Sequence, residues 1–185
     1  MQYPELHAAF VVLLVGTQAF FTALSVLNVR HADRLVDRKA SWLADTLGID
    51  DTNDLSDYHR LTTAFSELQS WVGLVVLLVV LYAGGFSWAV DLLAATGLST
   101  VSQGLLFFGG LVVAAQLFSL PFSVVSTFGI EEVFDFNQQT PRLFARDTVL
   151  TLGISLVFTV VLGGAILAFV NALPTLWPLA AWLLF

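Results

Sequence analysis

Four stretches of this sequence are apolar, almost free of charge and about as long as a helix that crosses a lipid bilayer. Such a helix needs about 20 apolar residues. Residues 8–27, 71–93, 103–122 and 148–170 meet this requirement. Hydrophobic residues make up 57% of the chain and charged residues only 11%, which leaves too few polar side chains to cover a water-facing surface. We therefore expect an all-α, polytopic transmembrane domain.

A fifth apolar segment, residues 174–185, is too short to cross the membrane as a helix. It contains Trp177 and Trp182, and tryptophan is typical of the membrane–water interface. We interpret this segment as the truncated start of a fifth span. The expected architecture is four complete spans plus part of a fifth, and we expect the chain to be the front part of a longer protein.

The polar residues gather in two segments between the spans, 28–70 and 123–147. All seven lysines and arginines of the chain lie in these two segments. Because short loops rich in Lys and Arg stay in the cytoplasm, the sequence predicts an outside N-terminus and two cytoplasmic loops. The net charge of −7 and the single lysine suit a halophilic archaeon, whose plasma membrane would then hold the protein. The chain has no basic stripe for nucleic acid.

The first polar segment reads as two helices that continue out of the membrane. Its apolar residues recur at helical spacing up to Gly48, which is a natural helix stop. Asp54 is placed to cap the next helix. Arg30 and Asp33 are three residues apart, so we expect them to pair along one helix.

Few residues in this chain are suited to catalysis or metal binding. Cysteine is absent, and the histidines are His7, His31 and His59, with no HExxH motif. We expect no catalytic residue, no metal site and no cofactor in this chain, and we interpret the histidines as solvated loop residues. Asp91 lies near a span end and Gln116 is uncharged, so neither suits the mid-membrane ionisable site that a transporter needs.

Small residues mark where helices can approach one another closely. The third span contains Gly104, Gly109, Gly110, Ala114 and Ala115, and the fourth span contains the pair Gly163 and Gly164. We expect close helix contacts at these positions.

The most specific part of the sequence is the stretch from Leu117 to Asp147, which contains the pattern LPFSxxxTFxIEExxxFNQQT. We expect the helix to break at Pro121 and a new helix to begin with Thr140 as its cap and Pro141 in its first position. Adjacent side chains on a helix point about 100° apart. Glu131 and Glu132 should therefore have different partners: one could pair with Arg142 or Arg146, and the other could cap a helix or face a partner surface.

This pattern resembles the N-terminal membrane domain of the Ste24-type CAAX prenyl proteases, a branch of the M48 zinc metallopeptidases. Tyr58 and Phe65, seven residues apart before the second span, fit the same family. One departure is Asp135, where the family favours glycine, a residue that takes positive φ more easily.

The resemblance implies a function for the whole family protein. The complete enzyme would be a zinc metalloendopeptidase with a large intramembrane chamber, and its zinc would be held by an HExxH motif that this chain lacks. The chain would then be a scaffold, inactive alone, whose partners are the lipid bilayer, the missing C-terminal catalytic domain and a peptide substrate. The candidate residues for contact with that domain or with the substrate chamber are Glu131, Glu132, Phe136, Asn137, Gln139 and Thr140.

Two alternatives stay open from the sequence. The first is a free-standing membrane partner or regulatory subunit with the same fold. The second is a small transporter.

Overall fold

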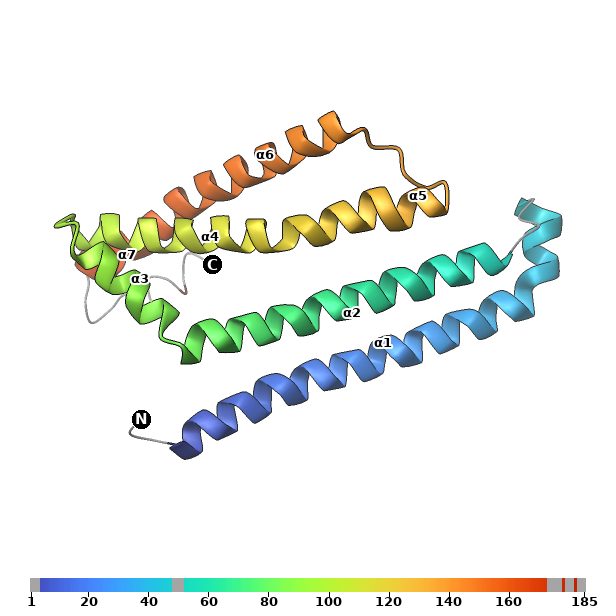
Figure 1. Cartoon of the computed structure of the whole chain (residues 1–185), viewed down its shortest axis with the longest axis horizontal. Helices are drawn as coiled ribbons and strands as arrows, with labels where there is room; N and C mark the ends of the chain where they lie inside the picture. Colours follow the sequence, from blue (N-terminus) through green and yellow to red (C-terminus); the bar gives the residue numbers. More distant parts are fainter. Residues whose placement is uncertain (1–3, 48–51, 173–177, 179–181, 183–185) are drawn as a thin grey trace. The chain divides into compact units, whose positions relative to one another are not determined.

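The computed structural model describes residues 4–47, 52–172, 178 and 182. These residues form helices and no strand, which confirms the all-α prediction. In chain order (Figure 1) the elements are α1 (Pro4–Leu47), α2 (Thr52–Tyr82), α3 (Gly85–Ala94), α4 (Thr100–Val125), the π-helix η1 (Ser126–Ile130), α5 (Glu131–Val133), α6 (Pro141–Phe158), the π-helix η2 (Thr159–Gly163) and α7 (Gly164–Ala172).

Four helical segments among the described residues are long and apolar enough to cross a membrane. They are Pro4–Val36, Asp54–Tyr82, Thr100–Val133 and Pro141–Ala172. This agrees with the prediction of four complete spans. The predicted start of a fifth span, residues 174–185, lies outside the described residues apart from Pro178 and Trp182.

The second predicted span, residues 71–93, is wrong in its C-terminal half. The helix α2 ends at Tyr82, and the short helix α3 begins only at Gly85. Between them Gly84 has a φ of 79°, a left-handed conformation that glycine adopts without steric cost and that ends a helix. Side-chain polarity does not change across this break, so only the Gly84-Gly85 pair marks it in the sequence.

The chain divides into two compact units. The first comprises Met1–Val79 and Phe122–Asn137, and the second comprises Val80–Pro121 and Gln138–Phe185. Each unit is stabilised by its own contacts.

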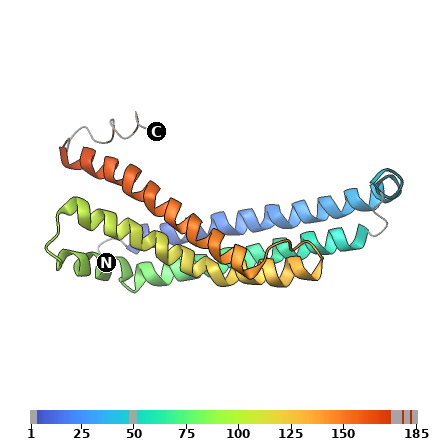
Figure 2. The ribbon, with the colours of Figure 1, turned by 90° about the horizontal axis from the view of Figure 1, so that it is seen from above.

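In the first unit α1 and α2 run side by side in opposite directions (Figures 1 and 2). The 44 residues of α1 correspond to about 66 Å of helix, which exceeds the roughly 30 Å of bilayer hydrocarbon. The helix therefore continues into the polar 28–70 segment, as the sequence predicts. It ends at Leu47, and the predicted stop Gly48 lies outside the described residues.

The prediction that Asp54 caps α2 is wrong, because α2 already begins at Thr52. Asp54 lies in the first helical turn. A carboxylate is still favoured there, because it faces the positive end of the helix dipole.

In the second unit small residues allow close helix contacts at several of the predicted positions, but not at Gly110, where a Cβ would meet no other described side chain or helix within 4 Å. A methyl group on Gly104 of α4 would lie 2.7 Å from Cδ1 of Leu167 on α7, so the two helices meet at this glycine. Gly163 and Gly164 lie against the side chain of Leu105, at 3.8 and 3.9 Å from the position that a Cβ would take. These contacts are the close backbone approaches that small residues permit in membranes.

The predicted helix break at Pro121 is wrong. Pro121 lies inside α4, which continues to Val125 and then widens into the π-helix η1. Proline removes one backbone N–H from the helix, but in membrane helices local π-type adjustments can satisfy the freed carbonyl groups. The polar 123–147 segment is consequently helical up to Val133, and its connection is only residues 134–140.

Candidate functional site

The candidate site is the turn that follows α5, at the end of the long helix through Pro121. Among the described residues only Ile130 is buried, with 6% of its surface exposed, and it lies directly before this turn. Ile130 is the last residue of the π-helix η1, and single π-helical turns of this kind occur often at functional sites. The sequence region with the most specific motif therefore also contains the most enclosed side chain.

Backbone hydrogen bonds fix the shape of the turn. The amide of Phe136 donates to the carbonyl of Glu131 at 2.8 Å, and the amide of Asp135 donates to the carbonyl of Glu132 at 3.2 Å. This pair of bonds defines a Schellman motif, whose penultimate residue takes a left-handed conformation. That residue is Asp135, with a φ of 56°.

This left-handed φ occurs at Asp135, the position where the resemblance implies a preference for glycine. Glycine adopts a left-handed φ without strain, whereas other L-residues incur a steric cost. Aspartate is among the few residues that tolerate it, because its short polar side chain can form local hydrogen bonds. The turn therefore has the shape that a glycine would favour.

The two neighbouring glutamates have different surroundings, as predicted. The carboxylate of Glu132 accepts a hydrogen bond of 2.7 Å from Nδ2 of Asn137, which closes the turn with a side-chain contact. The carboxylate of Glu131 is half-buried and has no hydrogen-bond or ion-pair partner among the described residues. The expected pairing with Arg142 or Arg146 would join the two units and stays a prediction.

An aromatic contact attaches the turn to α2. The ring of Tyr58 lies edge-on to Phe136, with 4.7 Å between the ring centroids, and edge-on to Phe134 at 5.4 Å. Seven residues further along α2, Phe65 lies 5.9 Å from the ring of Phe122. Edge-to-face aromatic pairs contribute about 0.5–1.5 kcal/mol beyond their buried area. The sequence singled out Tyr58 and Phe65 but gave no sign that Tyr58 contacts this turn or that Phe65 contacts α4.

The remaining two candidate residues belong to the second unit. The side-chain oxygen of Thr140 accepts a hydrogen bond of 3.3 Å from the amide of Leu143, and Pro141 is the first residue of α6. The predicted helix cap is therefore confirmed. Gln139 precedes this cap and is exposed. The structure thus brings together Glu131, Glu132, Phe136 and Asn137, whereas Gln139 and Thr140 are described only within the other unit.

A second polar cluster joins α1 to α2, and the sequence gave little sign of it. The hydroxyl of Thr22 donates to Oε2 of Glu67 at 2.6 Å, and the indole Nε1 of Trp71 donates to Thr22 at 3.0 Å. The side chain of Ser25 donates a further hydrogen bond to Glu67. Glu67 is the last charged residue before the apolar part of α2. This position was the one feature of the sequence that could have indicated a polar contact between α1 and α2.

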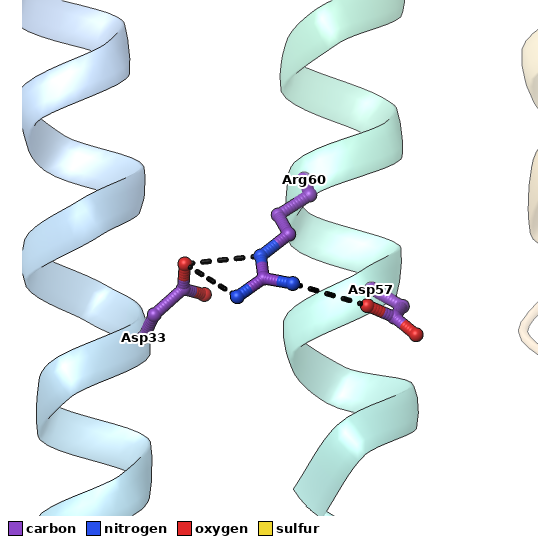
Figure 3. A network of polar contacts seen from close by, with 3 residues as sticks. All are labelled: Asp33, Asp57 and Arg60. Atoms are coloured by element: carbon purple, nitrogen blue, oxygen red, sulfur yellow. Dashed lines mark hydrogen bonds and ion pairs between the residues drawn. The ribbon is translucent and has the colours of Figure 1, made fainter.

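The same two helices share an ion pair (Figure 3). Arg60 contacts Oδ2 of Asp33 through Nη2 at 2.9 Å and through Nε at 3.0 Å, and it also contacts Asp57 at 3.5 Å. Asp33 therefore pairs with α2, and the expected pairing with Arg30 on its own helix is wrong. Both guanidinium nitrogens contact the same carboxylate oxygen of Asp33, whereas its Oδ1 is buried and has no hydrogen-bond partner among the described residues.

The described residues do not suit a zinc site. They contain no group of three or more His, Asp or Glu side chains close enough to hold a metal ion. The interpretation of His59 as a solvated residue is wrong, since its Nε2 is buried and has no hydrogen-bond partner among the described residues. His31 is exposed, as expected.

These observations define a class of protein: an integral membrane protein with four apolar helices of membrane-spanning length. The family model for the N-terminal part of CAAX prenyl proteases, described as five membrane helices, matches residues 28–185. The chain therefore belongs to this family and is its N-terminal membrane domain.

A curated relative supports the assignment. The chain is 34% identical over 120 residues to a protein named probable CAAX prenyl protease 1 from Schizosaccharomyces pombe. The aligned region covers 57% of this chain but only 25% of the relative. No solved structure matched the chain.

Proposed function

We propose that the chain is the membrane scaffold half of a Ste24-like zinc metalloendopeptidase whose HExxH half lies outside these 185 residues. The aligned region spans a quarter of the relative, which leaves most of that protein for a catalytic part. The M48 family assignment supports a zinc peptidase as the whole. Zinc and a peptide substrate would then be bound mainly by the other half, and this chain would wall the substrate chamber.

The single observation that carries this proposal is the fixed turn after α5. Its backbone is held by the Schellman hydrogen bonds, and Tyr58 holds its aromatic residues. Glu132 is engaged within the turn, whereas the carboxylate of Glu131 has no partner among the described residues. A half-buried carboxylate without a partner is unfavourable, so Glu131 is suited to receive a basic side chain, either from the catalytic half, as we propose, or from Arg142 or Arg146.

The proposal predicts different effects for two isosteric variants in the full-length family protein. Glu131→Gln should weaken the attachment of the catalytic half, because it removes the charge that faces the partner. A lost hydrogen-bonded charge contact costs about 1.5–3 kcal/mol, and we expect limited proteolysis between the halves to accelerate accordingly. Zinc content, measured by elemental analysis, should stay at the unsubstituted level.

Glu132→Gln is the matched control, because glutamine can still accept the hydrogen bond from Asn137. It should leave both the proteolysis rate and the zinc content unchanged. If Glu131→Gln lowered the zinc content as much as it weakened the attachment of the catalytic half, that result would contradict the scaffold role. A natural protein that lacks any HExxH half would instead favour the free-standing partner subunit.

The orientation in the membrane is part of the same proposal. All seven Lys and Arg residues lie in the 28–70 and 123–147 segments, so we infer that these segments are cytoplasmic and the N-terminus is outside. The chain has no cysteine, so single substitutions give unambiguous labelling. Asp54→Cys should react only from the cytoplasm and Ala95→Cys only from outside. Labelling of both from one side would overturn this topology.

A further inference from the structure

A pocket of about 330 Å³ lies between α1 and α2 in the first unit. Apolar side chains, among them Val26 and Val29, form much of its wall. Arg30, Arg60 and Glu67 are among its polar lining residues. None of the functions discussed above uses this pocket.

The pocket lies where the two helices leave the predicted membrane region. The first apolar run ends at Leu27, and the apolar part of α2 begins at Trp71. The indole of Trp71 donates its hydrogen bond to Thr22 at this level, and tryptophan is enriched at the membrane–water interface. The pocket therefore lies directly beyond the two apolar runs, where headgroups are expected if those runs fill the hydrocarbon region.

Four charged side chains line the pocket, and their charges sum to zero: Arg30, Asp33, Arg60 and Glu67. Arg60 and Asp33 neutralise each other in the ion pair of 2.9 Å. Glu67 is contacted by hydroxyl groups, and neither it nor Arg30 has an ion-pair partner among the residues that the structure describes. The pocket thus offers one uncompensated cation and one uncompensated anion.

The spacing of these two charges limits the ligand. Ser25 is level with Glu67 because the two side chains are hydrogen-bonded. Arg30 lies five residues after Ser25, which corresponds to a rise of about 7–8 Å along the helix axis and a turn of about 140° around it, so the two charged groups are farther apart than the rise alone. A phosphate and a primary ammonium group joined by two carbon atoms can bridge this span when each adds a hydrogen bond of about 3 Å.

We propose that this pocket binds a zwitterionic lipid headgroup of the phosphoethanolamine class, with its phosphate at Arg30 and its ammonium group at Glu67. The ammonium group donates hydrogen bonds to the carboxylate, which a quaternary choline cannot do. A phosphoglycerol headgroup would leave the Glu67 charge without a counter-ion. Pockets with basic side chains between membrane helices are established headgroup sites, and here the added carboxylate selects a zwitterion. This inference is independent of the proposed peptidase function.

Native mass spectrometry tests the proposal. The purified chain is placed in nanodiscs that contain equal amounts of phosphatidylethanolamine, phosphatidylcholine and phosphatidylglycerol, and the lipids that stay bound after its release are identified. We expect phosphatidylethanolamine to be retained at least five-fold more than phosphatidylcholine or phosphatidylglycerol. Glu67→Gln should abolish the preference for phosphatidylethanolamine over phosphatidylcholine. Arg30→Ala should lower the retention of both, because both lipids carry the phosphate.

Two control variants make the same charge changes outside the pocket. Asp54→Asn and Arg34→Ala, both at exposed positions on α2 and α1, should keep the unsubstituted lipid preference. Each of three outcomes would overturn the proposal. They are equal retention of all three lipids, a preference for phosphatidylglycerol, and a preference for phosphatidylethanolamine over phosphatidylcholine that survives Glu67→Gln. Free phosphoethanolamine that binds as tightly as the lipid would overturn the assignment to a lipid source.

Discussion

Replacement of Asp135 tests whether the turn after α5 has the backbone conformation described above. Asp135 has a φ of 56°, and a left-handed conformation costs an L-residue about 1–2 kcal/mol. Glycine avoids this cost but loses about 0.5–1 kcal/mol through its greater freedom when the turn opens. Asp135→Gly should therefore stabilise the closed turn by up to about 1 kcal/mol.

The opposite sign is expected for Asp135→Ala. Alanine keeps the Cβ that causes the steric cost but lacks the polar group that lets aspartate form local hydrogen bonds in this conformation. The closed turn should lose about 0.5–1 kcal/mol, which is a two- to five-fold change in its opening equilibrium.

Amide hydrogen exchange in detergent measures this equilibrium directly. The reporters are the amides of Phe136 and Asn137, which both donate to the carbonyl of Glu131 at 2.8 and 3.1 Å. Their exchange should slow in Asp135→Gly and accelerate two- to five-fold in Asp135→Ala, as worked out above.

A matched control is Asp91→Gly in α3, where the backbone is right-handed helix. Glycine should destabilise that helix by about 0.5–1 kcal/mol and accelerate exchange of the Ala95 amide, which donates to the Asp91 carbonyl at 3.1 Å. Faster exchange at both sites on substitution with glycine would refute the assigned conformation of Asp135.

Two further predictions concern the second unit. Thr140→Ala should cost about 1 kcal/mol of helix stability and accelerate hydrogen exchange of the Leu143 amide. Thr140→Ser keeps the hydroxyl and should change neither. Equal effects of the two substitutions would contradict the role of Thr140 as the helix cap. Gly104→Val should lower the thermal midpoint in detergent, by an overpacking cost of about 1–3 kcal/mol, because even a Cβ would lie 2.7 Å from Leu167 Cδ1. Gly110→Val is its control, since no described atom lies within 4 Å of that position, and a similar loss in both variants would count against the close contact.

Some site features could be predicted because they depend on neighbours in sequence. The cap at Thr140 needs only its own hydroxyl and the amide three residues later, so the Thr140-Pro141 pair was sufficient. Similarly, Glu131 and Glu132 differ in surroundings because adjacent helical side chains diverge. The positive φ at Asp135 could be suspected from the glycine that the family favours there.

Other features could not be predicted because they depend on groups far apart in sequence. Asp33 is three residues from Arg30 but pairs with Arg60, 27 residues away, because the antiparallel helices bring that guanidinium into contact with it. Glu67 meets Thr22 for the same reason, across 45 residues. Pro121 was expected to end a helix, but α4 continues through it to Val125.

The sequence by itself determined that this protein is helical and embedded in a membrane, because the transfer of an apolar run into lipid depends on the composition of that run alone. It also determined the family, through the motif from Leu120 to Thr140. Only the tertiary structure decided that Tyr58 holds the turn after α5, that Glu131 is left without a partner among the described residues, and that α1 and α2 enclose a pocket with opposite charges. These properties depend on the distances between side chains of different helices, and such distances exist only once the helices have packed.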